Sequence, residues 1–166
     1  MKLFDRAGII LASGLGIGFC PFAPGTAGTL FAIPLYLELY TLTFWITANT
    51  SLNNVVVYVA FVVMLFILGV WASKIASFHW KSKDPQTVVI DEITGFLVAM
   101  TGVTPSTISI ILGFILFRCL DIVKIWPANW IDRKIPGGLG IMLDDIASGL
   151  QTWVLLNIIL FLSQML

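Results

Sequence analysis

Five carboxylates have the residue type and the placement to hold a metal ion. They stand at the edges of long uncharged stretches, as Asp91, Glu92, Asp121, Asp144 and Asp145. Oxygen ligands of this kind suit Mg²⁺, which binds through few carboxylates, keeps several waters and often completes its shell with substrate phosphate. We therefore expect all five to be magnesium ligands, and Asp91, Asp121 and Asp145 to be the catalytic acids.

Two of these carboxylates come from one adjacent pair, Asp91-Glu92, and two from another, Asp144-Asp145. Each pair precedes an uncharged run, so we expect each at the start of a helix. Neighbouring helical residues point about 100° apart, so one member could ligate a metal while the other bonds surrounding groups. Acids at a helix start also complement the helix dipole without any ligand. For either pair alone, that simpler interpretation is favoured.

Arg118, Asp121 and Lys124 are spaced i, i+3 and i+6, which predicts that they line one side of a helix. Two cations around one acid could bind a phosphate group. An exposed ladder of ion pairs would produce the same spacing. The sequence of this segment alone does not decide between the two.

A glycine-rich segment, residues 14–29, leads into the first long apolar stretch. Backbone N–H groups near glycine, and those in the first turn of a helix, can approach an anion, which makes Thr26 and Gly28 candidate phosphate-binding residues. Small residues could equally serve close helix packing. A second glycine segment, residues 136–140, could be a flexible lid or a plain turn.

Other catalytic machinery is excluded by residues that the chain lacks. With His79 as the one histidine, a zinc site rich in histidine cannot form. Cys20 and Cys119 lack metal-type spacing and are not followed by the arginine of a cysteine phosphatase loop. No P-loop and no Asp-x-Asp motif is present.

The composition indicates the class of protein in which these residues lie. Of 166 residues, 58% are hydrophobic and 11% charged, which argues against both a water-soluble and a disordered chain. Nine basic residues balance nine acidic ones, so no cationic surplus points to nucleic acid. We expect a membrane protein forming one domain over residues 1–166.

Four uncharged stretches separate the charge clusters and predict the helices. Two are clean spans, Thr29–Ala48 and Val55–Ser73, and a third, Ile93–Phe117, is interrupted at residues 101–106, so that a short helix and a longer returning helix are expected. The stretch Ile146–Leu166 supplies one more span. The predicted fold is an all-α polytopic bundle of about five helices, with residues 7–19 as an interfacial or re-entrant segment.

This path places every lysine and arginine on one side of the membrane. By the positive-inside rule that side is cytoplasmic, and the acids lie on it. We therefore expect a multi-pass membrane protein with a site that faces the cytoplasm. No obligatory protein partner is expected.

Taken together and in order, the motifs resemble the phosphatidylglycerophosphatase A family. The similarity covers about residues 10 to 150 and rests on four motifs: Pro24-Gly25-Thr26-Ala27-Gly28-Thr29-Leu30, Asp91-Glu92-x-x-Gly95, Phe117-Arg118-x-x-Asp121-x-x-Lys124, and Gly137-Gly138-Leu139-Gly140-Ile141-Met142-x-Asp144-Asp145-x-x-x-Gly149.

The resemblance implies a magnesium-dependent enzyme of the bacterial cytoplasmic (inner) membrane that converts a phospholipid, phosphatidylglycerophosphate, to phosphatidylglycerol and phosphate. The family's motif positions fall on Thr26, Asp91, Glu92, Arg118, Asp121, Lys124, Asp144 and Asp145. The sequence departs from the family pattern at three positions: Ile125 stands where a proline is expected, Thr29 stands where serine is commoner, and Glu38 lies inside the first span. Because an acid in lipid is costly, we expect Glu38 to face the bundle or another helix.

Three alternatives belong to other classes. A small ion-coupled transporter would carry acids near the middle of the membrane, whereas here all but Glu38 lie at predicted helix ends. A phosphatidyltransferase that uses a CDP-alcohol would carry an Asp-Gly-x2-Ala-Arg pattern, which is missing. A structural membrane protein would use the acids only as partners of helix dipoles.

Overall fold

The computed structural model describes residues 3–48 and 50–165, and this part of the chain is helical without a strand. Seven α-helices and one 3₁₀ turn follow in order: α1 (Leu3–Ala12), η1 (Ile17–Phe19), α2 (Pro24–Ala48), α3 (Asn54–Trp80), α4 (Ile90–Ala99), α5 (Thr107–Val123), α6 (Ala128–Lys134) and α7 (Gly137–Ser163). The predicted all-α fold is confirmed. The helix that the sequence did not predict is the short α6.

Three helices, α2, α3 and α7, are long and apolar enough to cross a membrane. The predicted spans Thr29–Ala48 and Val55–Ser73 lie inside α2 and α3. Helix α2 begins at a proline, whose missing N–H costs nothing in the first turn. Helix α3 begins where the Asn53 side chain accepts a hydrogen bond from the N–H of Val55 at 2.8 Å.

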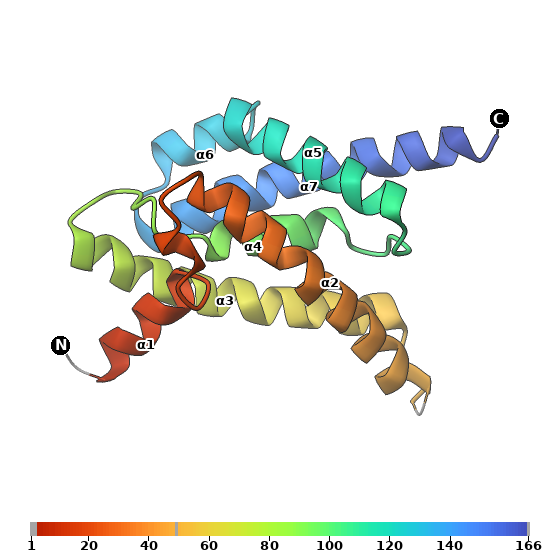
Figure 1. Cartoon of the computed structure of the whole chain (residues 1–166), viewed down its shortest axis with the longest axis horizontal. Helices are drawn as coiled ribbons and strands as arrows, with labels where there is room; N and C mark the ends of the chain where they lie inside the picture. Colours follow the sequence, from red (N-terminus) through yellow and green to blue (C-terminus); the bar gives the residue numbers. More distant parts are fainter. Residues whose placement is uncertain (1–2, 49, 166) are drawn as a thin grey trace.

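The predicted break inside Ile93–Phe117 is also confirmed, because α4 ends at Ala99 and α5 begins at Thr107. Ser106 and Ser109 form a reciprocal capping box that starts α5. Helix α4 has 10 residues and so rises only about 15 Å. It is buried and contacts α2, α3, α5 and α7 (Figure 1).

Backbone groups freed at the end of α4 find side-chain partners. The Tyr58 hydroxyl donates to the Leu97 carbonyl at 2.9 Å, and the Tyr36 hydroxyl donates to the Val103 carbonyl at 2.7 Å. Carbonyl groups away from water need such partners. The two tyrosines therefore hold the inner end of α4 and, through it, the position of its first turn.

Helix α7 corrects two expectations. It begins at Gly137, so Asp144 and Asp145 lie about two turns into the helix and not at its start. Residues 137–140 form the first turn and are neither a lid nor a plain turn. The reason is packing: a Cβ at Gly138 would lie 2.2 Å from the Val70 carbonyl oxygen, so glycine lets α7 approach α3.

Glu38 is exposed on α2, so the expectation that it faces the bundle is wrong. The inner face of α2 is taken by Ala32 and Tyr36, which are fully buried. Two residues beyond Tyr36 the helix has turned by about 200°, which directs Glu38 outward.

The N-terminal segment lies beside α3 and is tied to the start of α4. Helix α1 contacts α3, and the N–H of Val89 donates to the Ala12 carbonyl at 2.9 Å. Helix α1 has 10 residues and so rises about 15 Å, half of a bilayer core. That length agrees with an interfacial segment, and entry into the membrane stays a prediction.

Candidate active site

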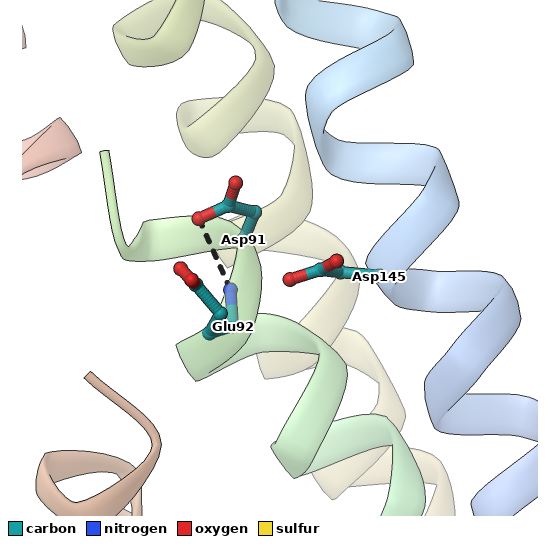
Figure 2. A group of neighbouring side chains, drawn as sticks. All are labelled: Asp91, Glu92 and Asp145. Carbon is teal, nitrogen blue, oxygen red and sulfur yellow. Dashed lines mark hydrogen bonds between the residues drawn. The ribbon is translucent and has the colours of Figure 1, made fainter. Parts of the chain in front are cut away.

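The site forms at the end of the bundle where α4 begins. Asp91 and Glu92 lie in the first turn of α4, as the sequence predicts, and Asp145 points toward them from α7 (Figure 2). One carboxylate oxygen from each of the three lies within 4.8 Å of the others. Residues more than 50 positions apart in the sequence thus form one cluster of three acids.

Two glycines bring α4 and α7 close enough to form this cluster. A Cβ at Gly95 would lie 2.7 Å from the Asp145 carbonyl oxygen, and one at Gly149 would lie 2.3 Å from the Gly95 carbonyl oxygen. Real Cβ atoms are not found at such distances, so a larger residue at either position must push the helices apart. The glycines that end the second and fourth sequence motifs, Gly95 and Gly149, are therefore explained by helix contact.

Several oxygens of the cluster are buried without a partner among the described residues. They are Oε2 of Glu92, Oδ1 of Asp144 and Oδ2 of Asp145. Asp91 has one internal partner, since its Oδ1 accepts the N–H of Glu92 at 3.1 Å (Figure 2). Buried carboxylates without compensation are costly, so this arrangement calls for a cation or for protons.

The acids of α4 have raised pKa values. Burial raises the pKa of Asp91 to about 7, and the nearby carboxylates of Asp84 and Asp144 add to the rise against the opposing hydrogen bond with Glu92. Burial and the Asp91 carboxylate raise the pKa of Glu92 well above its usual range. A cluster that shifts its pKa values by burial and like charge is typical of functional sites.

Arg118 connects the cluster to α5 and α2. Its Nη1 donates to Oδ2 of Asp121 at 2.7 Å, which confirms that these two residues share a helix face. The same nitrogen lies 3.9 Å from Oε1 of Glu92 and 3.4 Å from Oγ1 of Thr29. The guanidinium group is therefore held against the acids, with its Nε buried and unpartnered.

Lys124 does not continue the helix face of Arg118 and Asp121. Helix α5 ends at Val123, and Lys124 is its C-cap, in a left-handed conformation with φ of 49°. Its Nζ donates to Oδ2 of Asp144 and lies 3.8 Å from Oδ1 of Asp132. The predicted i, i+3, i+6 face is thus wrong in its last member.

The charge of Lys124 is stabilised by its partners. Burial alone would lower the pKa of Lys124, but the carboxylates of Asp144 and Asp132 outweigh it and hold the pKa above its ordinary value. Asp132 comes from α6, a helix that the sequence did not predict, so sequence reasoning missed it. Asp84, in the loop before α4, was missed because an acid close to Lys81 and Lys83 in the sequence is typical of a solvated loop, and burial raises the pKa of its carboxyl group.

These groups line one cavity of about 480 Å³. Every predicted acid and both predicted cations lie on its wall: Asp91, Glu92, Asp121, Asp144, Asp145, Arg118 and Lys124. Asp121 and Asp144 are engaged with the cations, whereas Asp91, Glu92 and Asp145 have the mutual spacing of a metal site.

The two residues predicted from the glycine-rich segment are not on this wall. A Cβ at Gly28 would lie 2.8 Å from Cβ of Val89, so Gly28 serves helix packing. Thr26 is also absent from the lining residues, and its phosphate-binding role stays a prediction. Pro24 and Gly25 line the cavity instead, and a Cβ at Gly25 would lie 2.1 Å from Oε1 of Glu92.

The donor set fits Mg²⁺ on structural grounds. All of the converging ligand atoms are carboxylate oxygens, some of them have no partner, and the cavity beside them leaves room for water and a further ligand. Small hard cations prefer oxygen ligands of this kind.

The fold and the site together define a membrane-associated helical enzyme with an acidic and cationic cavity suited to a phosphorylated substrate. Comparison with known proteins narrows this class. The chain belongs to the phosphatidylglycerophosphatase A family, whose family model matches residues 10–160.

Curated relatives agree with this family. Phosphatidylglycerophosphatase A of Escherichia coli is 37% identical over 142 residues, which cover 84% of this chain and 76% of the relative. Phosphatidylglycerophosphatase A of Haemophilus influenzae is 30% identical over 142 residues, 85% of this chain and 81% of the relative. A Bacteroides thetaiotaomicron protein, named provisionally as a phosphatidylinositol-3-phosphatase, is 33% identical over 158 residues, 90% of this chain and 91% of the relative. No solved structure matches the chain significantly.

Proposed function

We propose that this enzyme hydrolyses the terminal phosphomonoester of phosphatidylglycerophosphate, with Mg²⁺, at the cytoplasmic face of a bacterial inner membrane. The observation that carries the proposal is the convergence of Asp91, Glu92 and Asp145 beside Arg118 in one cavity. A chain of this family that brings three acids and a guanidinium group together has the groups that phosphoryl transfer requires.

Asp91, Glu92 and Asp145 would hold the magnesium ion, with Asp121 and Asp144 as neighbouring acids that ligate it or bond its waters. When bound, the ion would polarise the phosphoryl group and lower the pKa of a bound water. Its charge also offsets that of the acids, which would otherwise repel a phosphate.

The chain's cations would bind the phosphoryl group. Arg118 and Lys124 lie on the cavity wall, each paired with an acid that holds it in place. Arg118 can offer two parallel N–H groups to phosphate oxygens, and Lys124 offers a mobile point charge. The first turn of α2 reaches the same cavity through Pro24 and Gly25, and N–H groups in the first turn of a helix lack intrahelical partners and can bind an anion.

The substrate must place a phosphomonoester at the end of the bundle, with its acyl chains alongside the helices. The names of the relatives differ in the headgroup, glycerophosphate in two and phosphorylated inositol in one. The shared chemistry is a phosphomonoester on a lipid headgroup. The four sequence motifs favour phosphatidylglycerophosphate.

The cytoplasmic orientation is supported by the distribution of cations. The turns at residues 50–53 and 100–106, at the opposite end of the bundle, contain no lysine or arginine. The described cations gather at the end that carries the site, which the positive-inside rule assigns to the cytoplasm. An ion-coupled transporter would instead need acids along a path through the membrane.

The test uses purified protein in lipid nanodiscs with controlled free Mg²⁺. Release of inorganic phosphate is followed with phosphatidylglycerophosphate and, in parallel, with phosphatidylinositol 3-phosphate. Faster turnover of the glycerophosphate lipid, loss in EDTA and recovery with Mg²⁺ would support the proposal. Full turnover in chelator would refute the role of Mg²⁺. Faster turnover of phosphatidylinositol 3-phosphate would refute phosphatidylglycerophosphate as the preferred substrate.

A further inference from the structure

A second hollow lies at the same end of the molecule and shares no lining residue with the acidic cavity. It has a volume of about 1020 Å³ and is formed by α1, the last turns of α3, the following loop and the start of α7. We refer to it as the α1–α3 groove. Nothing in the proposed reaction uses it.

The groove is cationic. Lys74, Lys81 and Lys83 line it, against Asp5 as the acid on its wall. Lys83 is engaged with Asp132 at 3.5 Å, outside the groove. Lys74 and Lys81 form no ion pair with any residue in 3–48 or 50–165. Two lysines therefore remain available to an anion.

Aromatic rings form another part of the wall. The rings of Phe4 and Trp71 meet edge to face with centroids 4.8 Å apart, and Phe78 is 87% exposed. Trp71, Lys74 and Phe78 follow one another at i, i+3 and i+7, so they share one face of the end of α3, and Lys81, the C-cap of that helix, lines the same groove. This face alternates apolar rings with positive charges.

The groove lies at the level of lipid headgroups. Helix α3 has 27 residues and rises about 40 Å, more than the roughly 30 Å of a bilayer core. If about 20 residues cross the core from Val55, the crossing ends near Lys74. Aromatic residues and lysines are both typical of that boundary, where rings contact acyl chains and ammonium groups contact phosphates.

We propose that the α1–α3 groove binds one anionic phospholipid, with its phosphate on Lys74 and Lys81 and an acyl chain against Phe4 and Trp71. The charge complementarity and the aromatic wall select this occupant, because a zwitterionic lipid would bring its own cation near the lysines. The proposal does not depend on the proposed reaction.

The test is native mass spectrometry of the detergent-purified chain, titrated with phosphatidylglycerol or with phosphatidylcholine of the same acyl chains. The wild type should retain one phosphatidylglycerol at least fivefold more tightly than phosphatidylcholine. Lys74→Gln combined with Lys81→Asn should remove that preference. Asparagine is chosen at Lys81 because the position is left-handed, with φ of 50°.

The matched control removes two charges from the same end of the molecule. Arg133→Gln combined with Lys134→Gln changes exposed residues of α6 that do not line the groove, and should keep the preference. Asp145→Asn should keep it too, because the acidic cavity is separate. Lys74→Gln alone serves if the double variant does not fold.

Three results would overturn the proposal. The wild type could bind both lipids equally, or the α6 variant could lose the preference as fully as the groove variant, which would indicate diffuse charge. Loss of the preference for phosphatidylglycerol in Asp145→Asn would place the bound lipid in the acidic cavity.

Discussion

Gly149 of α7 lies so close to Gly95 of α4 that a Cβ at Gly149 would be 2.3 Å from the Gly95 carbonyl oxygen. Each glycine stands four residues after an acid of the cluster, Gly95 after Asp91 and Gly149 after Asp145. Since residues at i and i+4 share a helix face, the contact that joins the helices also sets the two acids opposite each other. The spacing of the acid cluster is therefore determined by two residues without side chains.

Gly149→Ala should separate α4 from α7 and spread the acids. We expect a loss of about 1–3 kcal/mol in stability from overpacking, and a fall in kcat/KM at least as large as tenfold. Thermal unfolding and phosphate release measure the two effects. Gly113→Ala on α5 is the control, because its Cβ would meet the flexible Met100 side chain and not backbone. Equal effects of the two substitutions would contradict the role of this contact.

Asp145→Asn should abolish the response to magnesium while the fold is kept. The amide matches the carboxylate in size but removes one negative charge from the cluster, so we expect at least a 100-fold loss of kcat/KM, about 2.7 kcal/mol in the transition state. Phosphate release measured across a magnesium titration checks this. Glu38→Gln, which neutralises an exposed acid on α2, should leave the titration unchanged. A variant with wild-type activity at every magnesium concentration would favour a structural role for the acids.

Arg118→Lys should weaken the binding of the phosphoryl group. Lysine keeps the charge but lacks the planar pair of N–H donors with which Arg118 can hold Asp121 and still offer N–H groups to a phosphate. We expect a 10- to 100-fold fall in kcat/KM, about 1.4–2.7 kcal/mol. Steady-state kinetics with the lipid substrate check it, with Arg133→Lys on exposed α6 as the matched control. An unchanged kcat/KM in Arg118→Lys would show that the arginine does not bind the phosphoryl group.

Much of this arrangement could be predicted from the sequence, because charge is scarce in a membrane chain and its position is informative. The uncharged stretches located α2, α3 and the break between α4 and α5. Five of the six acids and both cations of the cavity wall were identified by type and spacing, and Asp84 was missed.

What could not be predicted depends on contacts between distant segments. The start of α7 at Gly137 requires the approach of Val70, and the turn at Lys124 requires Asp144 and Asp132 across the cavity. Gly25 was passed over in favour of Thr26 and Gly28, because only the fold shows which residue of a short glycine motif lies against Glu92.

Magnesium affinity should fall as the pH is lowered through about 7. Burial raises the pKa of Asp91 to about 7, so below that pH the metal-free carboxyl group carries a proton that the ion must displace. One displaced proton weakens the apparent affinity about tenfold for each pH unit below 7. The direction follows from the raised pKa: an acid of ordinary pKa would be ionised throughout this range and give no dependence.

Isothermal titration of the detergent-purified protein with Mg²⁺ between pH 5.5 and 8.5 measures this dependence of the affinity on pH. Asp91→Asn, which has no proton to lose at this position, should bind more weakly at pH 8 and lose most of the slope. A flat affinity profile in the wild type would show that Asp91 does not exchange its proton for the ion.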